Sequence, residues 1–237
     1  MTSSNAGFGQ DDVLHLGTFG TFGTLGASLD EIDSEDVMLV SFVLDMSSSM
    51  APLAGEVIAA FNGEVAALSG AKTATAILAA ATTFADVPEV LFGYQPLARV
   101  PKLSPTLYSA SGSTALHDAV LGVLERLVAY RLTLSDNGVR SRAVVIVLSD
   151  GEDNVSKRSV GEVKLAAQRL VRDESVVLAY AGFGGSPKSH QATADAMGFP
   201  HVITSGHSGK DLRRVLGVVS QSVLRAAAGG RPGGGFF

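Results

Sequence analysis

The hydrophobic positions of the chain form short apolar runs, and stretches with helical spacing separate them. Three runs are almost continuously apolar: residues 37–44, 143–148 and 176–181. Such runs are typical of strands that are buried on both faces of a parallel sheet. Between and after them, apolar residues recur at helical spacing, which predicts helices at 52–69, 116–127, 160–171, 191–197 and 212–223.

Two further β-like runs, at 73–84 and 89–94, are separated only by the short stretch 85–88. This spacing predicts an antiparallel hairpin at one edge of the sheet. A small strand is expected at 201–204. Because strands alternate with helices along most of the chain, we predict a doubly wound α/β fold with a mainly parallel sheet and helices on both faces.

The two ends of the chain differ from this pattern. A triplet of glycine, threonine and an aromatic or aliphatic residue repeats between Gly17 and Gly26, and acidic residues follow it. The repeat is either a flexible, solvated arm or a docking arm for self-association. In the second case its apolar anchors would be Phe19, Phe22 and Leu25. We therefore predict three parts: a Gly/Thr/Phe-rich arm at 1–36, an α/β domain at 37–228 and a glycine-rich tail at 229–237.

Composition narrows the class of protein. The 237 residues are 46% hydrophobic, which suits one well-buried α/β domain. The net charge of −5 and the lack of a basic cluster argue against a nucleic-acid partner. The chain has no cysteine, which excludes disulfides and thiolate metal sites. The N-terminus does not resemble a signal peptide, and the apolar run at 75–81 is too short to cross a bilayer. We therefore expect a cytoplasmic protein without a membrane partner.

Side chains with oxygen donors flank three of the predicted elements. They are Asp45, Ser47 and Ser49 after one buried strand, Thr114 before a helix, and Asp150 after another buried strand. Because the carboxyl ends of parallel strands meet at one edge of a sheet, we expect these oxygens to lie together. Carboxylate and hydroxyl oxygens are hard ligands that suit Mg²⁺ or Ca²⁺. Helix capping is the alternative for each segment, but it explains all three together much less easily.

The three segments resemble the metal-ion-dependent adhesion site (MIDAS) of von Willebrand factor A (vWA) domains, in residue type and in order. They read Asp-Met-Ser-Ser-Ser at 45–49, Ser-Gly-Ser-Thr-Ala-Leu at 111–116 and Leu-Ser-Asp-Gly at 148–151. Ser113 stands where many members carry glycine, and Ser149 where threonine is common, but neither position supplies a ligand. The resemblance covers about 37–228. It implies a doubly wound six-stranded sheet with one antiparallel edge strand. The chain looks most like the stand-alone bacterial members of the family.

The resemblance also implies a role for each residue of the site. Ser47 and Ser49 would bind the metal directly, and Thr114 directly or through water. Asp45 and Asp150 would act mainly through metal-bound waters. Mg²⁺ is the expected ion, with Mn²⁺ or Ca²⁺ as alternatives. Because neutral hydroxyls leave the ion electron-poor, an open coordination position would attract a carboxylate from a partner.

The expected function is therefore a metal-dependent protein–protein interaction module, not an enzyme. It would bind a partner's Asp or Glu within a cytoplasmic assembly, and analogy of fold suggests an AAA+ ATPase or kinase-type assembly. Ser111 and the loop 104–113 would form the rim, with Thr114 on a surface loop. The alternative is a Mg²⁺-dependent phosphoryl-transfer enzyme that uses Asp45. It has no P-loop, and Lys72 is expected at the opposite end of its strand.

Overall fold

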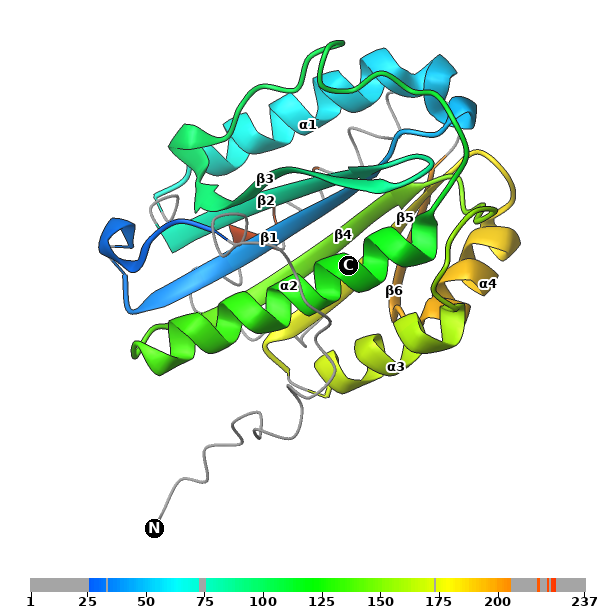
Figure 1. Ribbon diagram of the computed structural model, residues 1–237. Helices are drawn as coiled ribbons and strands as arrows, with labels where there is room; N and C mark the ends of the chain where they lie inside the picture. The colour runs from blue at the N-terminus through cyan, green and yellow to red at the C-terminus, as the bar shows by residue number, and fades with distance from the viewer. Residues whose placement is uncertain are drawn as a thin grey trace.

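The computed structural model describes residues 26–32, 34–72, 76–172 and 174–205, together with positions 217, 221, 223 and 224. The described part contains a six-stranded sheet in the order β3-β2-β1-β4-β5-β6 (Figure 1). The strands are β1 Asp36–Asp45, β2 Ile77–Phe84, β3 Pro88–Pro96, β4 Arg140–Ser149, β5 Val176–Phe183 and β6 His201–Ser205. Neighbouring strands are parallel except β2 and β3, which are antiparallel. The predicted doubly wound, mainly parallel sheet is confirmed.

Helices cover both faces of this sheet, as expected (Figure 1). One face carries α1 (Ala54–Ser69), and Val223 packs into the same core. The other face carries α2 (Leu116–Asp136), α3 (Val160–Leu170) and α4 (Pro187–Met197). Three short 3₁₀ helices complete the described elements: η3 Leu29–Glu31, η4 Ser48–Leu53 and η6 Leu97–Arg99.

Strand β1 lies at the centre of the sheet and explains the longest apolar run. Successive side chains of a strand point to opposite faces, so a strand covered on both sides needs apolar residues at almost every position. The core on the α1 face takes Met38, Val40, Phe42 and Leu44. The core on the α2 face takes Val37, Leu39 and Val43. The strand ends at Asp45, so this carboxylate lies at the carboxyl-terminal edge of the sheet.

Some element boundaries differ from the sequence prediction. The helix expected from residue 52 begins at Ala54, because Ser48–Leu53 forms a 3₁₀ turn that contains Pro52. The helix expected around 191–197 begins at Pro187, because the Ser186 hydroxyl accepts a hydrogen bond from the Ser189 N–H and so caps it. Strand β3 begins at Pro88, within the expected turn.

Several predictions fall on segments outside the described residues. They are residues 1–25 of the arm, the start of the expected strand at 73–75, most of the last helix at 212–223 and the tail at 229–237. Positions 217, 221, 223 and 224 within or beside that last helix are helical. In the described part of the chain, no helix combines the length and the apolar character needed to cross a membrane.

Candidate functional site

The first segment of the site is the turn after β1. Strands β1 and β4 are parallel neighbours with Leu44 opposite Leu148, so that Asp45 and Ser149 come to the same edge. One carboxylate oxygen of Asp45, Oδ1, accepts a hydrogen bond of 2.9 Å from the Ser47 N–H. The other, Oδ2, accepts one of 2.6 Å from the Ser149 hydroxyl. Both oxygens of Asp45 are therefore held by neighbouring groups.

Two serines of the same turn place their hydroxyls side by side. The Oγ atoms of Ser47 and Ser49 are 3.0 Å apart. Ser47 is buried and Ser49 is exposed, so the pair leads from the interior of the turn to its surface. Ser47 occupies the N-cap position of η4, but its side chain makes no capping hydrogen bond there. The helix-capping interpretation of this serine is therefore wrong.

The second segment, the loop before α2, is bound to the first by main-chain hydrogen bonds. The Ser111 N–H donates to the Met46 carbonyl at 2.8 Å. The Ser48 N–H and hydroxyl both donate to the Gly112 carbonyl, at 3.1 and 2.8 Å. These contacts bring the loop 104–113 beside the Asp45 turn. Gly112 has a φ of +81°, which glycine adopts without strain.

Thr114 connects the second segment to the third. Its N–H donates to the Asn154 side-chain oxygen at 2.8 Å, and its carbonyl accepts from the Asn154 N–H at 3.0 Å. The expectation that Thr114 lies at the surface is wrong, because the residue is only 2% exposed. Its loop is packed between the β1 turn and the segment after β4. Its hydroxyl forms no hydrogen bond within the described residues, and the N-cap of α2 is Ala115.

The electrostatics of the site act on Asp45, its buried carboxylate. Asp45 is 1% exposed, and this burial raises its pKa. Hydrogen bonds from Ser149 and Ser47 oppose the rise, because they favour the ionised form, whereas the negative charge of Asp150 adds to it. Asp150 is half-buried, and its Oδ1 accepts a long hydrogen bond of 3.4 Å from the Glu152 N–H. A cation near both groups would relieve their repulsion.

Two tyrosines and one serine support the site and were not assigned a role from the sequence. The Tyr108 hydroxyl donates to the Asp45 carbonyl, and the Tyr180 hydroxyl donates to the Ser149 carbonyl at 3.3 Å. Ser149 is fully buried and holds Asp45 directly. The sequence feature that could have pointed to Tyr108 is that it is a single tyrosine within a loop rich in proline and serine. The feature that could have pointed to Ser149 is its hydroxyl at the end of a buried strand.

The structure thus brings the three predicted segments to one edge of the sheet, while their role as metal ligands stays a prediction. Over the described ranges, no group of three or more His, Asp and Glu residues is placed to hold a metal. The candidate site has two carboxylates and depends on hydroxyls for its other donors. His117, one helical turn after Thr114, contacts Asp153, with 3.0 Å between Nδ1 and Oδ2.

Comparisons with known proteins identify the fold. No protein-family model matches the chain, and no curated protein matches it in sequence. Among solved structures, a von Willebrand factor type A protein from Catenulispora acidiphila aligns with 80% of this chain at a TM-score of 0.55 and 17% identity. BatB, a conserved hypothetical protein from Bacteroides thetaiotaomicron, aligns with 81% at a TM-score of 0.52 and 15% identity.

A third match is the pilus adhesin SpaC from Lactobacillus rhamnosus GG, which aligns with 82% of this chain at a TM-score of 0.61 and 12% identity. The alignments span 43% of the Catenulispora protein, 30% of SpaC and 99% of BatB. This chain therefore matches less than half of the Catenulispora protein and of SpaC, and nearly all of BatB. The chain has a vWA-like, Rossmann-like α/β fold.

Proposed function

We propose that this protein is a metal-dependent protein-interaction module. In this proposal Ser47, Ser49 and Thr114 hold a Mg²⁺ ion, Asp45 and Asp150 act mainly through its waters, and a partner supplies an Asp or Glu. The observation that carries the proposal is the convergence of three separate segments on one edge of the sheet through direct hydrogen bonds.

The donor set fits a hard cation. The hydroxyl oxygens of Ser47 and Ser49 are close enough to face one ion, and neither hydroxyl is used to cap a helix. The Thr114 hydroxyl is also free of hydrogen bonds within the described part of the chain. Both oxygens of Asp45 already accept hydrogen bonds, which favours contact through water over direct ligation. Hydroxyls, carboxylates and waters are the ligands that Mg²⁺ takes in proteins.

The surface around the site suits a protein partner. Three apolar side chains on loops at this edge are exposed: Val87 at 58%, Leu107 at 41% and Val155 at 41%. Their loops are tied to the site, since the Val155 N–H donates to the Thr114 carbonyl at 3.3 Å and the Asp86 carboxylate accepts from the Ser113 N–H at 2.9 Å. We therefore expect the partner to present its acidic residue with apolar neighbours. An AAA+ ATPase or kinase-type assembly is the kind of partner that the resemblance suggests.

The first test is metal binding by the full chain. Calorimetric titration of the EDTA-treated protein with Mg²⁺ should show one site, and Asp150→Ala should abolish it. Glu152→Ala is the matched control, because it removes an exposed carboxylate two residues away that is not a proposed ligand. Equal heats in all three proteins would refute the metal site.

The second test concerns the partner. A partner protein that binds the chain in Mg²⁺ should be released in EDTA. Changing one of the partner's acidic residues to Asn or Gln should abolish the binding. Affinity that is the same in Mg²⁺, in EDTA and after these substitutions would place the interaction on another surface. Turnover of a phosphomonoester that depends on Asp45 would instead favour the phosphoryl-transfer alternative.

A further inference from the structure

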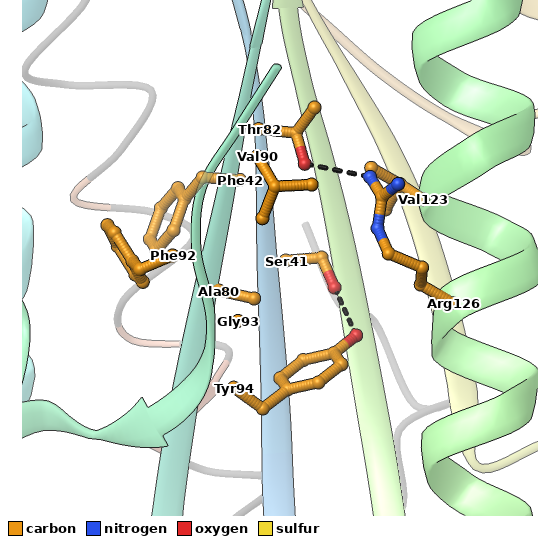
Figure 2. A pocket seen from close by; sticks show the side chains of 10 residues that line it. All are labelled: Ser41, Phe42, Ala80, Thr82, Val90, Phe92, Gly93, Tyr94, Val123 and Arg126. Carbon is orange, nitrogen blue, oxygen red and sulfur yellow. Dashed lines mark hydrogen bonds between the residues drawn. The ribbon is translucent and has the colours of Figure 1, made fainter. Parts of the chain in front are cut away.

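A small hollow lies between the β2–β3 hairpin and helix α2 (Figure 2). Its volume is about 20 Å³, which exceeds the roughly 10–15 Å³ that one water molecule needs. Part of its wall is apolar, with Val90 from β3 and Val123 from α2. Its lining includes none of the residues proposed to hold a metal, so the hollow is a separate feature of the fold.

Arg126 of α2 brings a positive charge to this hollow. Its guanidinium donates to the Thr82 hydroxyl at 2.9 Å and forms no ion pair within the described residues. The adjacent acid on the helix, Glu125, lies instead against Arg158, with 3.6 Å between the carboxylate and the guanidinium. Burial lowers the pKa of Arg126, because it disfavours the charged form. A guanidinium carries five N–H donors, so most of those of Arg126 have no acceptor in the described part of the chain.

Three buried hydroxyls add further donors to the hollow. Thr82 Oγ1 accepts from Arg126, which leaves its own hydrogen to donate. The hydroxyls of Ser41 and Tyr94 are 2.6 Å apart, and one of them donates to the other (Figure 2). Burial raises the pKa of Tyr94, so this hydroxyl keeps its proton at neutral pH. The hydroxyl that accepts in this pair therefore has a hydrogen of its own, for which the described residues provide no acceptor.

The hollow thus has more donors than acceptors, together with a positive charge. A water molecule would accept hydrogen bonds there, but it would bring two more donors that need acceptors. An anion only accepts, and it also neutralises a guanidinium whose burial without a counter-charge is costly. We propose that the hollow is a binding site for one small monovalent inorganic anion of the chloride class, held by Arg126, Thr82 and the Ser41–Tyr94 pair.

The size and the charge of the hollow select this class of ligand. The hollow has room for about one group of the size of a water molecule, which suits a single halide ion. One negative charge balances the one guanidinium, whereas a divalent anion would leave a net charge that is partly shielded from water. The apolar side chains Val90 and Val123 supply no competing polar groups.

A bound anion would connect four elements of the fold. Ser41 belongs to β1, Thr82 to β2, Tyr94 to β3 and Arg126 to α2. The ion would therefore fix the edge hairpin to the central strand and to the helix that covers it. Because such an ion binds the folded state and not the unfolded chain, the protein should be more stable in chloride.

Urea unfolding of the full chain tests this expectation. It is measured in mixtures of sodium chloride and sodium gluconate at constant ionic strength, so that the screening of charges does not change. EDTA is present throughout, and the result therefore does not depend on the proposed metal site. With chloride at ten times its dissociation constant, the unfolding equilibrium constant should fall on the order of tenfold, and the effect should saturate. A chloride effect that is absent or does not saturate would overturn the proposal.

Variants assign the chloride effect to the hollow. Arg126→Gln removes the positive charge and Thr82→Val removes a donor, so both should lose most of the effect. Arg131→Gln is the matched control on the same helix, because Arg131 donates to Ser141 and Ser175 and does not line the hollow. This control should keep the full effect. An equal chloride effect in the wild type and in Arg126→Gln would overturn the proposal.

Bromide gives a direct test that needs no variant. Crystals of the wild-type protein soaked in sodium bromide should show an anomalous difference peak in the hollow, beside the Arg126 guanidinium and the Thr82 hydroxyl. This map decides if Arg126→Gln or Thr82→Val does not fold. Water without an anomalous signal at this place, or a carboxylate of the chain itself, would overturn the proposal.

Discussion

The hydrogen bond between Ser149 and Asp45 gives the sharpest test of the site's architecture. Ser149 is fully buried. Its hydroxyl donates to Asp45 Oδ2 at 2.6 Å and accepts from the Gly151 N–H at 3.0 Å. Ser149→Ala removes both bonds and leaves a buried carboxylate oxygen without its donor. A hydrogen bond to a charged group contributes about 1.5–3 kcal/mol. We therefore expect the metal-free protein to lose stability by this amount, with a melting temperature lower by roughly 3–12 °C.

The loss of stability caused by Ser149→Ala should be larger at higher pH. Burial raises the pKa of Asp45, and the Ser149 hydrogen bond opposes that rise. A carboxyl group whose pKa is higher in the folded state binds more protons there than in the unfolded state. Stability therefore falls as the pH rises from the unfolded pKa through the folded one. Without the Ser149 hydroxyl the folded pKa rises further, so the fall extends to higher pH. The variant should be closer to the wild type at pH 5 than at pH 8.

Urea unfolding in EDTA at pH 5 and pH 8 measures both effects. EDTA removes the contribution of any bound cation, so that the comparison reports on the hydrogen bond alone. Ser149→Thr is the control, because it keeps the hydroxyl that Asp45 needs. An ordinary surface substitution changes the free energy of unfolding by about 0.5 kcal/mol or less. If Ser149→Ala changes it by no more than this at both pH values, this account of the site is refuted.

Two further predictions concern the loops and helices around the site. Gly112→Ala should destabilise the protein more than Gly138→Ala in urea unfolding, because both have positive φ, of +81° and +78°, but only a Cβ at Gly112 would contact Asp86 Oδ2, at 2.8 Å. Equal losses would show that this contact is absent or yields easily. Ser159→Ala should lower stability by about 1 kcal/mol in thermal unfolding, since Ser159 and Glu162 form a capping box at the start of α3. No loss would mean that the box does not contribute.

The sheet could be predicted because burial leaves a strong signal in the sequence. Strand β1 has a helix-covered core on each face, so its apolar run is nearly unbroken, and the same holds for β4. The carboxyl-terminal position of Asp45 follows from that run. The capping box of α3 was also visible, because Ser159 and Glu162 stand at the required spacing.

The details of the site could not be predicted, because they depend on contacts between distant segments. Thr114 is buried by its reciprocal hydrogen bonds with Asn154, which lies 40 residues away in sequence. Ser149 and Asp45 are separated by 104 positions, and nothing in either local pattern shows that they touch. The start of α1 was misplaced for a different reason, since proline fits equally well in the 3₁₀ turn that precedes the helix.

The structure also bears on why this turn contains charged residues at all. If Asp45, Ser47 and Thr114 served only to cap helices, their side chains would bond to the first N–H groups of η4 and α2. The side chains of Ser47 and Thr114 make no such bonds, and the first N–H groups of α2, at His117 and Asp118, donate instead to the side chains of Asp153 and Ser156. Burial raises the pKa of Asp45 and opposes its ionisation, and the negative charge of the nearby Asp150 adds to that rise. An asparagine at position 45 would accept the Ser47 hydrogen bond without that electrostatic penalty. A pair of acids beside clustered hydroxyls is electrostatically unfavourable in an empty turn, and a cation would offset that cost. This is the physical basis of the proposed metal site.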